Sequence, residues 1–148
     1  MASSETFSLL AYLVTFGGPE FVPAPRDTWQ LVQELDLLSG RLLSAAHAAF
    51  LERHPMEADA WSTHPFAGIL GEWLRRLPFL PRMAVLDNYF ACGCKIFLRL
   101  GCVLLQRWHA RLKALGVDEP LGIIATTITN ADELLHDMFT FKYVLGVC

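Results

Sequence analysis

The segment from His54 to His64, HPMEADAWSTH, gathers side chains that could bind a metal ion. Two imidazoles (His54, His64) and two carboxylates (Glu57, Asp59) fall within eleven consecutive positions. Such groups are common ligands of divalent metals, but structural zinc sites place their ligands at short, recurring spacings. These four residues follow none of those spacings. We therefore interpret the segment as a solvated linker and keep a metal site as the less favoured alternative.

The cysteines offer a second possible metal site. A structural zinc ion needs four nitrogen or sulfur ligands, usually arranged as two closely spaced pairs. Cys92 and Cys94 flank Gly93, and no second pair of Cys or His follows at ligand spacing. The positions of all four cysteines are also unlike a disulfide framework. We predict buried or half-buried inert thiols in a reducing compartment, most simply the cytoplasm: Cys92, Cys94, Cys102 and Cys148.

Motifs of known enzyme classes are missing from the sequence. The chain has no glycine-rich phosphate loop, no G-x-S-x-G turn around a nucleophile and no H-E-x-x-H zinc motif. We therefore assign no catalytic, cofactor-binding or metal-binding residue, expect no cofactor, and do not predict an enzyme.

The composition indicates one apolar domain over residues 1–148. Hydrophobic residues make up 53% of the chain and charged residues 18%, and the mean hydropathy is +0.36. A chain of this length can bury a sizeable core. An apolar fraction this high indicates an unusually deep core or an apolar surface that a partner covers. The net charge of −3 gives no sign of a nucleic-acid partner.

The most apolar stretch, residues 82–108, raises the possibility of a membrane span. A span needs about 20 apolar residues with few charges, whereas Lys95 and Arg99 interrupt this run. At 100° per residue, the polar positions fall within about 40° of one line. The stretch therefore predicts a core helix with one narrow polar stripe, either solvated or facing an acidic partner, and no transmembrane span. The stripe comprises Lys95, Arg99, Cys102, Gln106, His109 and Lys113.

Helical periodicity extends along the rest of the chain. We predict an all-α bundle of about seven to eight helices, because apolar residues recur at spacings of three and four and no alternating pattern predicts a sheet. The expected helices cover residues 3–14, 27–40, 41–54, 63–77, 82–92, 94–115 and a last helix capped by Asn130 and Glu133. Residues 17–27 are expected to form a loop, and residues 121–128 fit either a helix or a strand. The expected core includes Trp73, Phe90, Phe97, Leu100, Leu104 and Trp108.

The order of these elements resembles the C-terminal half of the TBC domain, the all-helical domain of Rab GTPase-activating proteins. The resemblance is carried mainly by HPFAGILGEWLRRLPFLPRMAVLDNYFACGCKIFLRLGCVLL, residues 64–105, and extends from about residue 5 to 141 through SSETFSLLAYLV, LVQELDLL and NADELLHDMF. Leu86 and Cys92 replace the Trp and the acidic residue that the family usually has. The matching positions are Trp73, Leu77-Pro78, Asp87, Phe90 and Gly93-Cys94-Lys95.

The resemblance implies a function only in outline. TBC domains that activate GTPases supply an arginine from an IxxDxxR motif and a glutamine from YxQ, which act on the transferring phosphate and the attacking water. Neither motif occurs in this sequence; both belong to the family's N-terminal half. We therefore expect a non-catalytic TBC-like half-domain that serves as an interaction or structural subunit. The alternative is one part of a Rab GTPase-activating protein whose catalytic half lies elsewhere.

The same resemblance suggests the partners. Packed alone, the helices would expose the face that the other lobe covers in the family, so we expect a protein partner on that face. A small GTPase or a second copy of the chain are both candidates. Asp87 stands alone in the apolar run VLDNYF. Since an unpaired buried carboxylate is very costly, we favour a buried Asp87 held by hydrogen bonds over a solvated one.

Overall fold

The computed structural model describes residues 25–54 and 64–141, which form helices joined by short turns. Within these two ranges there are seven α-helices, one 3-10 helix and no strand, so the predicted all-α bundle is confirmed. Along the chain the elements are α2 (Pro25–Leu42), α3 (Ser44–Arg53), η2 (the 3-10 helix, Ala67–Leu70), α4 (Glu72–Arg76), α5 (Phe79–Cys92), α6 (Lys95–Leu115), α7 (Leu121–Thr126) and α8 (Ala131–Phe139).

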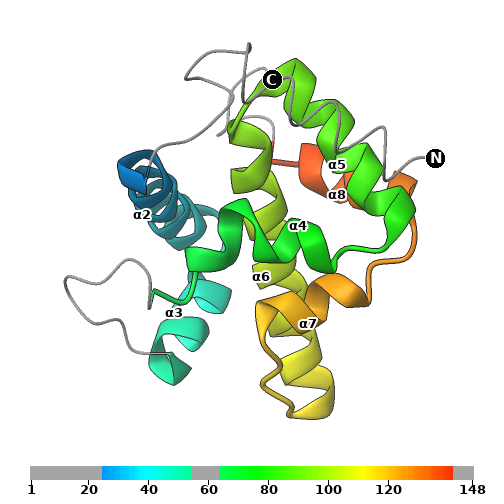
Figure 1. The fold of residues 1–148 in the computed structure, drawn as a ribbon. Coiled ribbons are helices and arrows are strands. Elements are labelled where there is room, and N and C mark those ends of the chain that lie inside the picture. The colour runs from blue at the N-terminus through cyan, green and yellow to red at the C-terminus, as the bar shows by residue number, and fades with distance from the viewer. Residues whose placement is uncertain (1–24, 55–63, 142–148) are drawn as a thin grey trace.

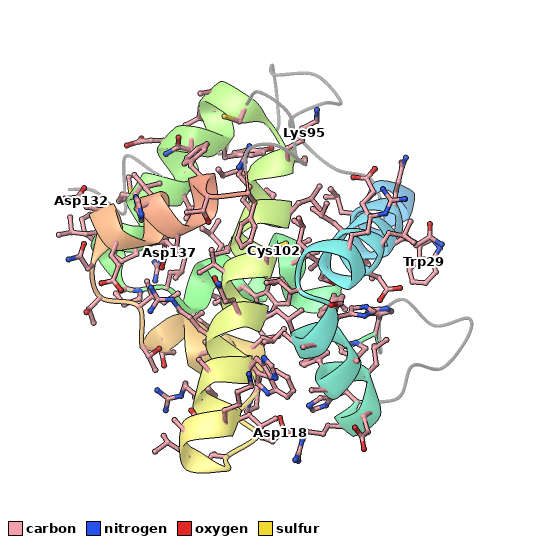
Figure 2. All side chains as sticks on the ribbon, turned by 180° about the vertical axis from the view of Figure 1, so that it is seen from behind. Trp29, Lys95, Cys102, Asp118, Asp132 and Asp137 are labelled. Carbon is pink, nitrogen blue, oxygen red and sulfur yellow. The ribbon has the colours of Figure 1, made fainter. Side chains whose placement is uncertain are left out.

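The longest helix, α6, is the centre of the bundle. It contacts α2, α3, η2, α5, α7 and α8. Figure 1 shows α2 and α3 on one side of it and α5 with α8 on the other, and Figure 2 shows the same arrangement from behind. Five of the six expected core residues are buried, and Phe90 is half-buried against the core. The buried five are Trp73, Phe97, Leu100, Leu104 and Trp108.

A glycine lies at each end of α6. Gly93 separates α5 from α6 with a φ of 73°, and Gly116 ends α6 in the left-handed conformation with a φ of 66°. A residue with a Cβ is strained in this region of backbone space, whereas glycine is not. The predicted break at Gly93 and the predicted end of the central helix near Leu115 are therefore confirmed.

Two predicted boundaries in the first half of the chain are wrong. The helix expected to end at Gly40 continues as α2 to Leu42 and begins at Pro25, inside the expected loop. Proline is tolerated there because the first residues of a helix need no intrahelical N–H bond. A glycine weakens a helix by only about 1 kcal/mol, which tertiary packing can outweigh. Here Ser39, next to Gly40, is fully buried.

The single helix expected over residues 63–77 is instead two short elements, η2 and α4. Gly71 lies between them at φ −142°, ψ −60°, outside the helical region. Leu77 is extended because it precedes Pro78, and α5 then begins at Phe79, three residues earlier than expected. The first expected helix, the chain before residue 25 and Thr63 lie outside the described residues.

The C-terminal part resolves the open choice over residues 121–128. Residues 121–126 form α7. The Asn130 side chain accepts a hydrogen bond from the backbone N–H of Glu133 at 3.0 Å, which confirms the predicted start of α8. None of the described helices is both long enough and apolar enough to cross a membrane.

The predicted polar stripe along α6 is wrong as a continuous face. Lys95, Gln106 and Lys113 are exposed, but the Arg99 residue is only 1% exposed and Cys102 is buried. The reason is α8, which packs over this part of the stripe. The Arg99 guanidinium donates a hydrogen bond to the carbonyl of Met138 at 3.2 Å and lies 4.8 Å from the centre of the Phe139 ring.

Candidate functional site

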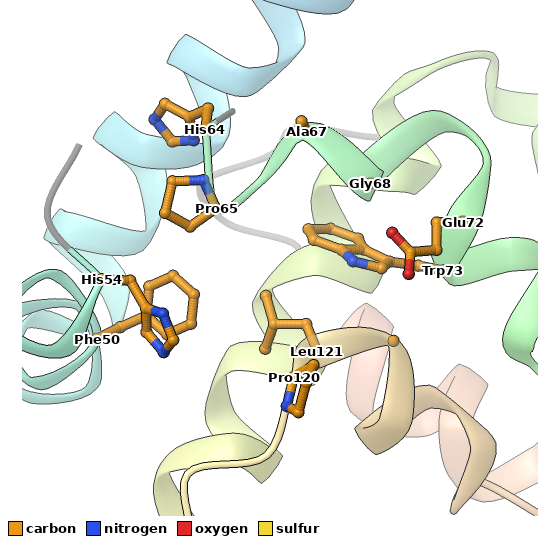
Figure 3. A pocket seen from close by; sticks show the side chains of 11 residues that line it. Phe50, His54, His64, Pro65, Ala67, Gly68, Glu72, Trp73, Pro120 and Leu121 are labelled. Carbon is orange, nitrogen blue, oxygen red and sulfur yellow. The ribbon is translucent and has the colours of Figure 1, made fainter. Parts of the chain in front are cut away.

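A pocket of about 260 Å³ lies beside the central helix and is partly open to solvent. Its walls come from the end of α3, from residues 64–73, which include η2 and the start of α4, and from residues 120–122 at the start of α7. Figure 3 shows His54 and Phe50 on one side of it, Trp73 and Glu72 on the other, and Pro120 with Leu121 below. Two neighbouring segments of the sequence, residues 50–54 and 64–73, therefore meet the distant residues 120–122 at this pocket.

The wall of the pocket combines aromatic side chains with polar surface in about equal measure. Trp73 and Phe50 are buried core residues whose side chains line it. Both contact Phe66, which stacks on Phe50 at 5.2 Å between ring centres and meets Trp73 edge-on at 6.5 Å. Aromatic pairs at these separations add stability beyond their buried area. The aromatic side chains are thus held in place from behind by the core.

One polar edge of the pocket is formed by His54, which belongs to a hydrogen-bonded cluster centred on the Asp118 carboxylate. The carboxylate of Asp118 accepts hydrogen bonds from Nε1 of Trp108 at 2.8 Å and from Nε2 of His54 at 3.1 Å. Burial raises the pKa of Asp118, but these bonds, together with the positive charges of His54 and Arg53, outweigh burial and lower the pKa. The group connects α3, α6 and the turn before α7, and it fixes the His54 ring at the pocket.

His64 is a neutral wall residue. Its Nδ1 accepts the backbone N–H of Phe66 at 3.0 Å, so the ring proton lies on Nε2 in the neutral form. Burial lowers the pKa of His64, and the negative charge of Asp36 only partly opposes that effect. The His64 ring is therefore uncharged at neutral pH.

Glu72 brings the one carboxylate that lines the pocket among the described residues. A Cβ built on Gly122 would lie 3.1 Å from Oε1 of Glu72, and a Cβ built on Gly68 would lie 3.3 Å from Oε2 and 2.7 Å from Nε1 of Trp73. The carboxylate therefore lies close to the backbone of two elements, η2 and α7, at the points where neither carries a side chain.

Of the four residues considered as metal ligands in the segment from His54 to His64, the structure describes two. His54 and His64 both line the pocket, whereas Glu57 and Asp59 lie outside the described residues. No group of three or more His, Cys, Asp or Glu in residues 25–54 and 64–141 is arranged to hold a metal ion. The hydrogen bonds of the two histidines go to Asp118 and to the backbone.

The cysteines and Asp87 depart in part from expectation. Cys94 is half-buried and Cys102 is buried, both as free thiols, and burial raises the pKa of Cys102 to about 12 despite the nearby charge of Arg99. These two fit the prediction of inert thiols. Cys92 does not, because it is disulfide-bonded. The favoured buried Asp87 is also wrong: the residue is exposed on α5, while its neighbour Leu86 is buried.

Glu72, Asp118 and the charge pairs that join helices were not among the residues predicted from the sequence. Arg107 forms ion pairs with Asp137 at 3.0 Å and Glu133 at 3.4 Å, which tie α6 to α8. Arg111 pairs with Glu119 in the turn after α6. At 100° per residue, Arg107 and Arg111 fall on the apolar side of the helix, away from the stripe that contains Lys95. Arginines on the otherwise apolar side of a helix indicate that acidic side chains of neighbouring elements pair with them, and this was the sequence feature that could have predicted the ion pairs.

No protein-family model matches the chain, and no curated protein and no solved structure matches it significantly. The resemblance to the TBC domain therefore rests on the quoted sequence features alone.

Proposed function

We propose that this chain is a non-catalytic helical subunit that binds another protein and resembles the C-terminal half of a TBC domain. The observation that supports the proposal is the start of α5, where two adjacent large apolar side chains face solvent. Phe79 is 48% exposed and Leu80 is 65% exposed. Exposed apolar side chains that lie next to each other form the kind of patch that a partner covers, whereas isolated ones are common on protein surfaces.

The backbone supports this surface. Pro78 precedes α5 and Pro81 is buried within its first turn, so the direction of this turn is restricted by two fixed φ angles. The guanidinium of Arg82 donates hydrogen bonds to the carbonyls of Arg75 and Leu77, at 2.9 Å and 2.8 Å. The end of α4 and the start of α5 are thereby joined. A partner would meet Phe79 and Leu80 on a rigid corner, which lowers the ordering cost of binding.

The partner of this surface is proposed to be a protein. The sequence resemblance suggests two candidates. One is a small GTPase of the Rab family, and the other is a different chain that carries the N-terminal half of a TBC domain. A second copy of this chain is the third. The three differ in the mass of the complex and in whether the purified chain associates alone.

A test of the proposal is the size of the complex that the chain forms in its own cells. We expect the tagged full-length chain to elute from gel filtration of a cell extract well above its own mass of 16.6 kDa. The double substitution Phe79→Ser, Leu80→Ser should shift it to the mass of the free chain. A matched control is Leu115→Ser, Val117→Ser, because these residues are 63% and 44% exposed at the end of α6.

Elution of the unsubstituted chain as a monomer would contradict the proposal, as would equal effects of the two double variants. Light scattering on the purified chain then separates self-association from binding of a different protein.

The second candidate, a contribution to GTPase activation, has its own test. The order of the motifs in residues 64–105 favours it. Because the sequence carries neither the arginine nor the glutamine motif of active TBC domains, the isolated chain should leave single-turnover GTP hydrolysis by a panel of Rab proteins unchanged. Faster hydrolysis by any Rab protein would contradict the non-catalytic assignment.

A further inference from the structure

The charge of the pocket beside α6 selects the ligands that it can hold. Among residues 25–54 and 64–141, no lysine or arginine lines it, and Glu72 is the one lining residue with a carboxylate. His64 is neutral, as its hydrogen bond to the backbone N–H of Phe66 requires. His54 already shares a hydrogen bond with Asp118. An anion would have to compete with Asp118 for His54, whereas a cation would find the Glu72 carboxylate without such a partner among the described residues.

The Glu72 carboxylate is available for such a cation. It takes part in no hydrogen bond or ion pair with any described residue. Arg76, one helical turn along α4, lies close enough for its Cγ to be 3.7 Å from the Cβ position of Gly122, yet its guanidinium does not pair with Glu72. Gly68 and Gly122 add no side chain of their own beside the carboxylate, and the Trp73 and Arg76 side chains are its neighbours there.

Part of the remaining wall can contact the apolar part of a small organic cation. The indole of Trp73 and the ring of Phe50 line the pocket with Leu121. Aromatic faces attract ammonium and guanidinium groups as well as alkyl chains. The volume of about 260 Å³ is below the range of roughly 300–1,000 Å³ for drug-sized ligands. The pocket therefore fits a group of the size of one amino-acid side chain rather than a nucleotide.

We propose that this pocket binds an alkylammonium or alkylguanidinium group, with Glu72 as the counter-ion and Trp73 and Phe50 as the wall against its alkyl chain. The group is supplied either by a free small amine or by a lysine or arginine side chain of another protein. Neither Phe79 nor Leu80 lines this pocket, so this proposal and the proposed interaction function can fail separately.

Isothermal titration of the full-length chain tests the chemistry with three probes of similar length: n-butylammonium, n-butylguanidinium and the neutral n-butanol. We expect at least one cation to bind at least tenfold more tightly than butanol. Glu72→Gln should weaken that cation by about tenfold or more and leave butanol unchanged. The matched control is Glu34→Gln, which removes an exposed carboxylate from α2 and should change nothing.

The fold of each variant is checked by its thermal midpoint, so that a loss of binding is not a loss of structure. Equal affinity for the cations and butanol would overturn the proposal, as would unchanged cation binding by a folded Glu72→Gln variant. The absence of binding by any probe would overturn it as well.

A fourth probe separates the two sources of the cation. Nα-acetyl-L-arginine methylamide carries the same guanidinium with peptide bonds on both sides. Binding within tenfold of n-butylguanidinium assigns the pocket to a side chain of another protein. Binding of n-butylguanidinium alone assigns it to a free amine.

Discussion

The two halves of α6 have nearly opposite surroundings, although they form one continuous helix. Every residue from Ile96 to Leu105 is buried, whereas Trp108 is the one buried residue between Gln106 and Leu115. In the first half even the charged Arg99 is covered, by Met138 and Phe139 of α8. In the second half the arginines pair with acidic residues that are themselves partly exposed.

This difference shows which information a helical wheel gives and which it does not. The wheel assigns residues to a face correctly, and Arg99 and Gln106 do share a direction around α6. It carries no information on how many helices cover that face at each level. The stability of the first half should therefore depend on packing, and that of the second half on hydrogen bonds and charge pairs. Five substitutions can break or sharpen this contrast.

The largest effect is expected in the fully buried half. Leu104→Ala should lower the free energy of unfolding by roughly 2–5 kcal/mol, because it leaves a cavity that a packed core cannot close. Leu112 is half-buried in the other half, so Leu112→Ala should cost about half as much or less. Urea unfolding followed by circular dichroism measures both. Equal losses would show that the two halves are packed alike.

A glycine in the first half should show the reverse of normal helix preference. In an exposed helix, Gly→Ala is stabilising by up to about 1 kcal/mol. A Cβ at Gly101, however, would lie 2.6 Å from Cδ2 of the buried Leu35 of α2. We expect Gly101→Ala to lower the free energy of unfolding by about 1 kcal/mol, since overpacking outweighs the helix preference. A stabilised variant in the same assay would mean that Leu35 can move away.

In the second half, Asp118 should make stability depend on acid pH. Asp118→Asn weakens the bonds to Trp108 and His54 and should cost about 1 kcal/mol at pH 7. The pKa of Asp118 is lower in the folded chain than its ordinary value of 3.8. Its charge therefore contributes fully above pH 3.8, and the contribution is lost as the pH falls from 3.8 through the folded pKa.

The difference in urea midpoint between the original chain and Asp118→Asn should accordingly shrink below pH 3.8. A difference that stays constant down to pH 2 would assign the effect to shape rather than charge.

The smallest effect is expected for the ion pair between α6 and α8. Asp137→Asn removes one partner of Arg107 and should cost about 0.2–1 kcal/mol, because both side chains are partly exposed. The loss should decrease as salt is raised from 0.05 to 0.5 M, since salt screens exposed pairs. A larger loss that is independent of salt would place this pair with the buried half of the helix.

Local signals made much of the fold predictable. Gly93 and Asn130 each mark a helix boundary by their own chemistry, and both predictions were confirmed. The periodicity of residues 95–115 predicted the central helix and its apolar buried residues, but not the burial of Arg99 and Cys102. These features depend on neighbours within a few positions, which the sequence shows directly.

Features that depend on distant segments were not predictable in the same way. The pocket exists because α4 packs against α7 and places Glu72 beside Gly122, fifty positions along the chain. Nothing near either residue in the sequence indicates the other. Asp87 was misjudged for a related reason: its apolar neighbours predicted burial of that stretch of α5, but the face on which Asp87 lies is the exposed one.

The central position of α6 also has a consequence for the newly made chain. Helices α2, α3 and α5 precede it in the sequence and pack against it in the folded protein. While the ribosome is still adding residues 43–115, the apolar side of α2 has no α6 to cover it. At about 5–20 residues per second this period lasts several seconds. We therefore expect the nascent chain to depend on chaperones until α6 has left the ribosome, and a pause in translation before residue 95 to increase aggregation.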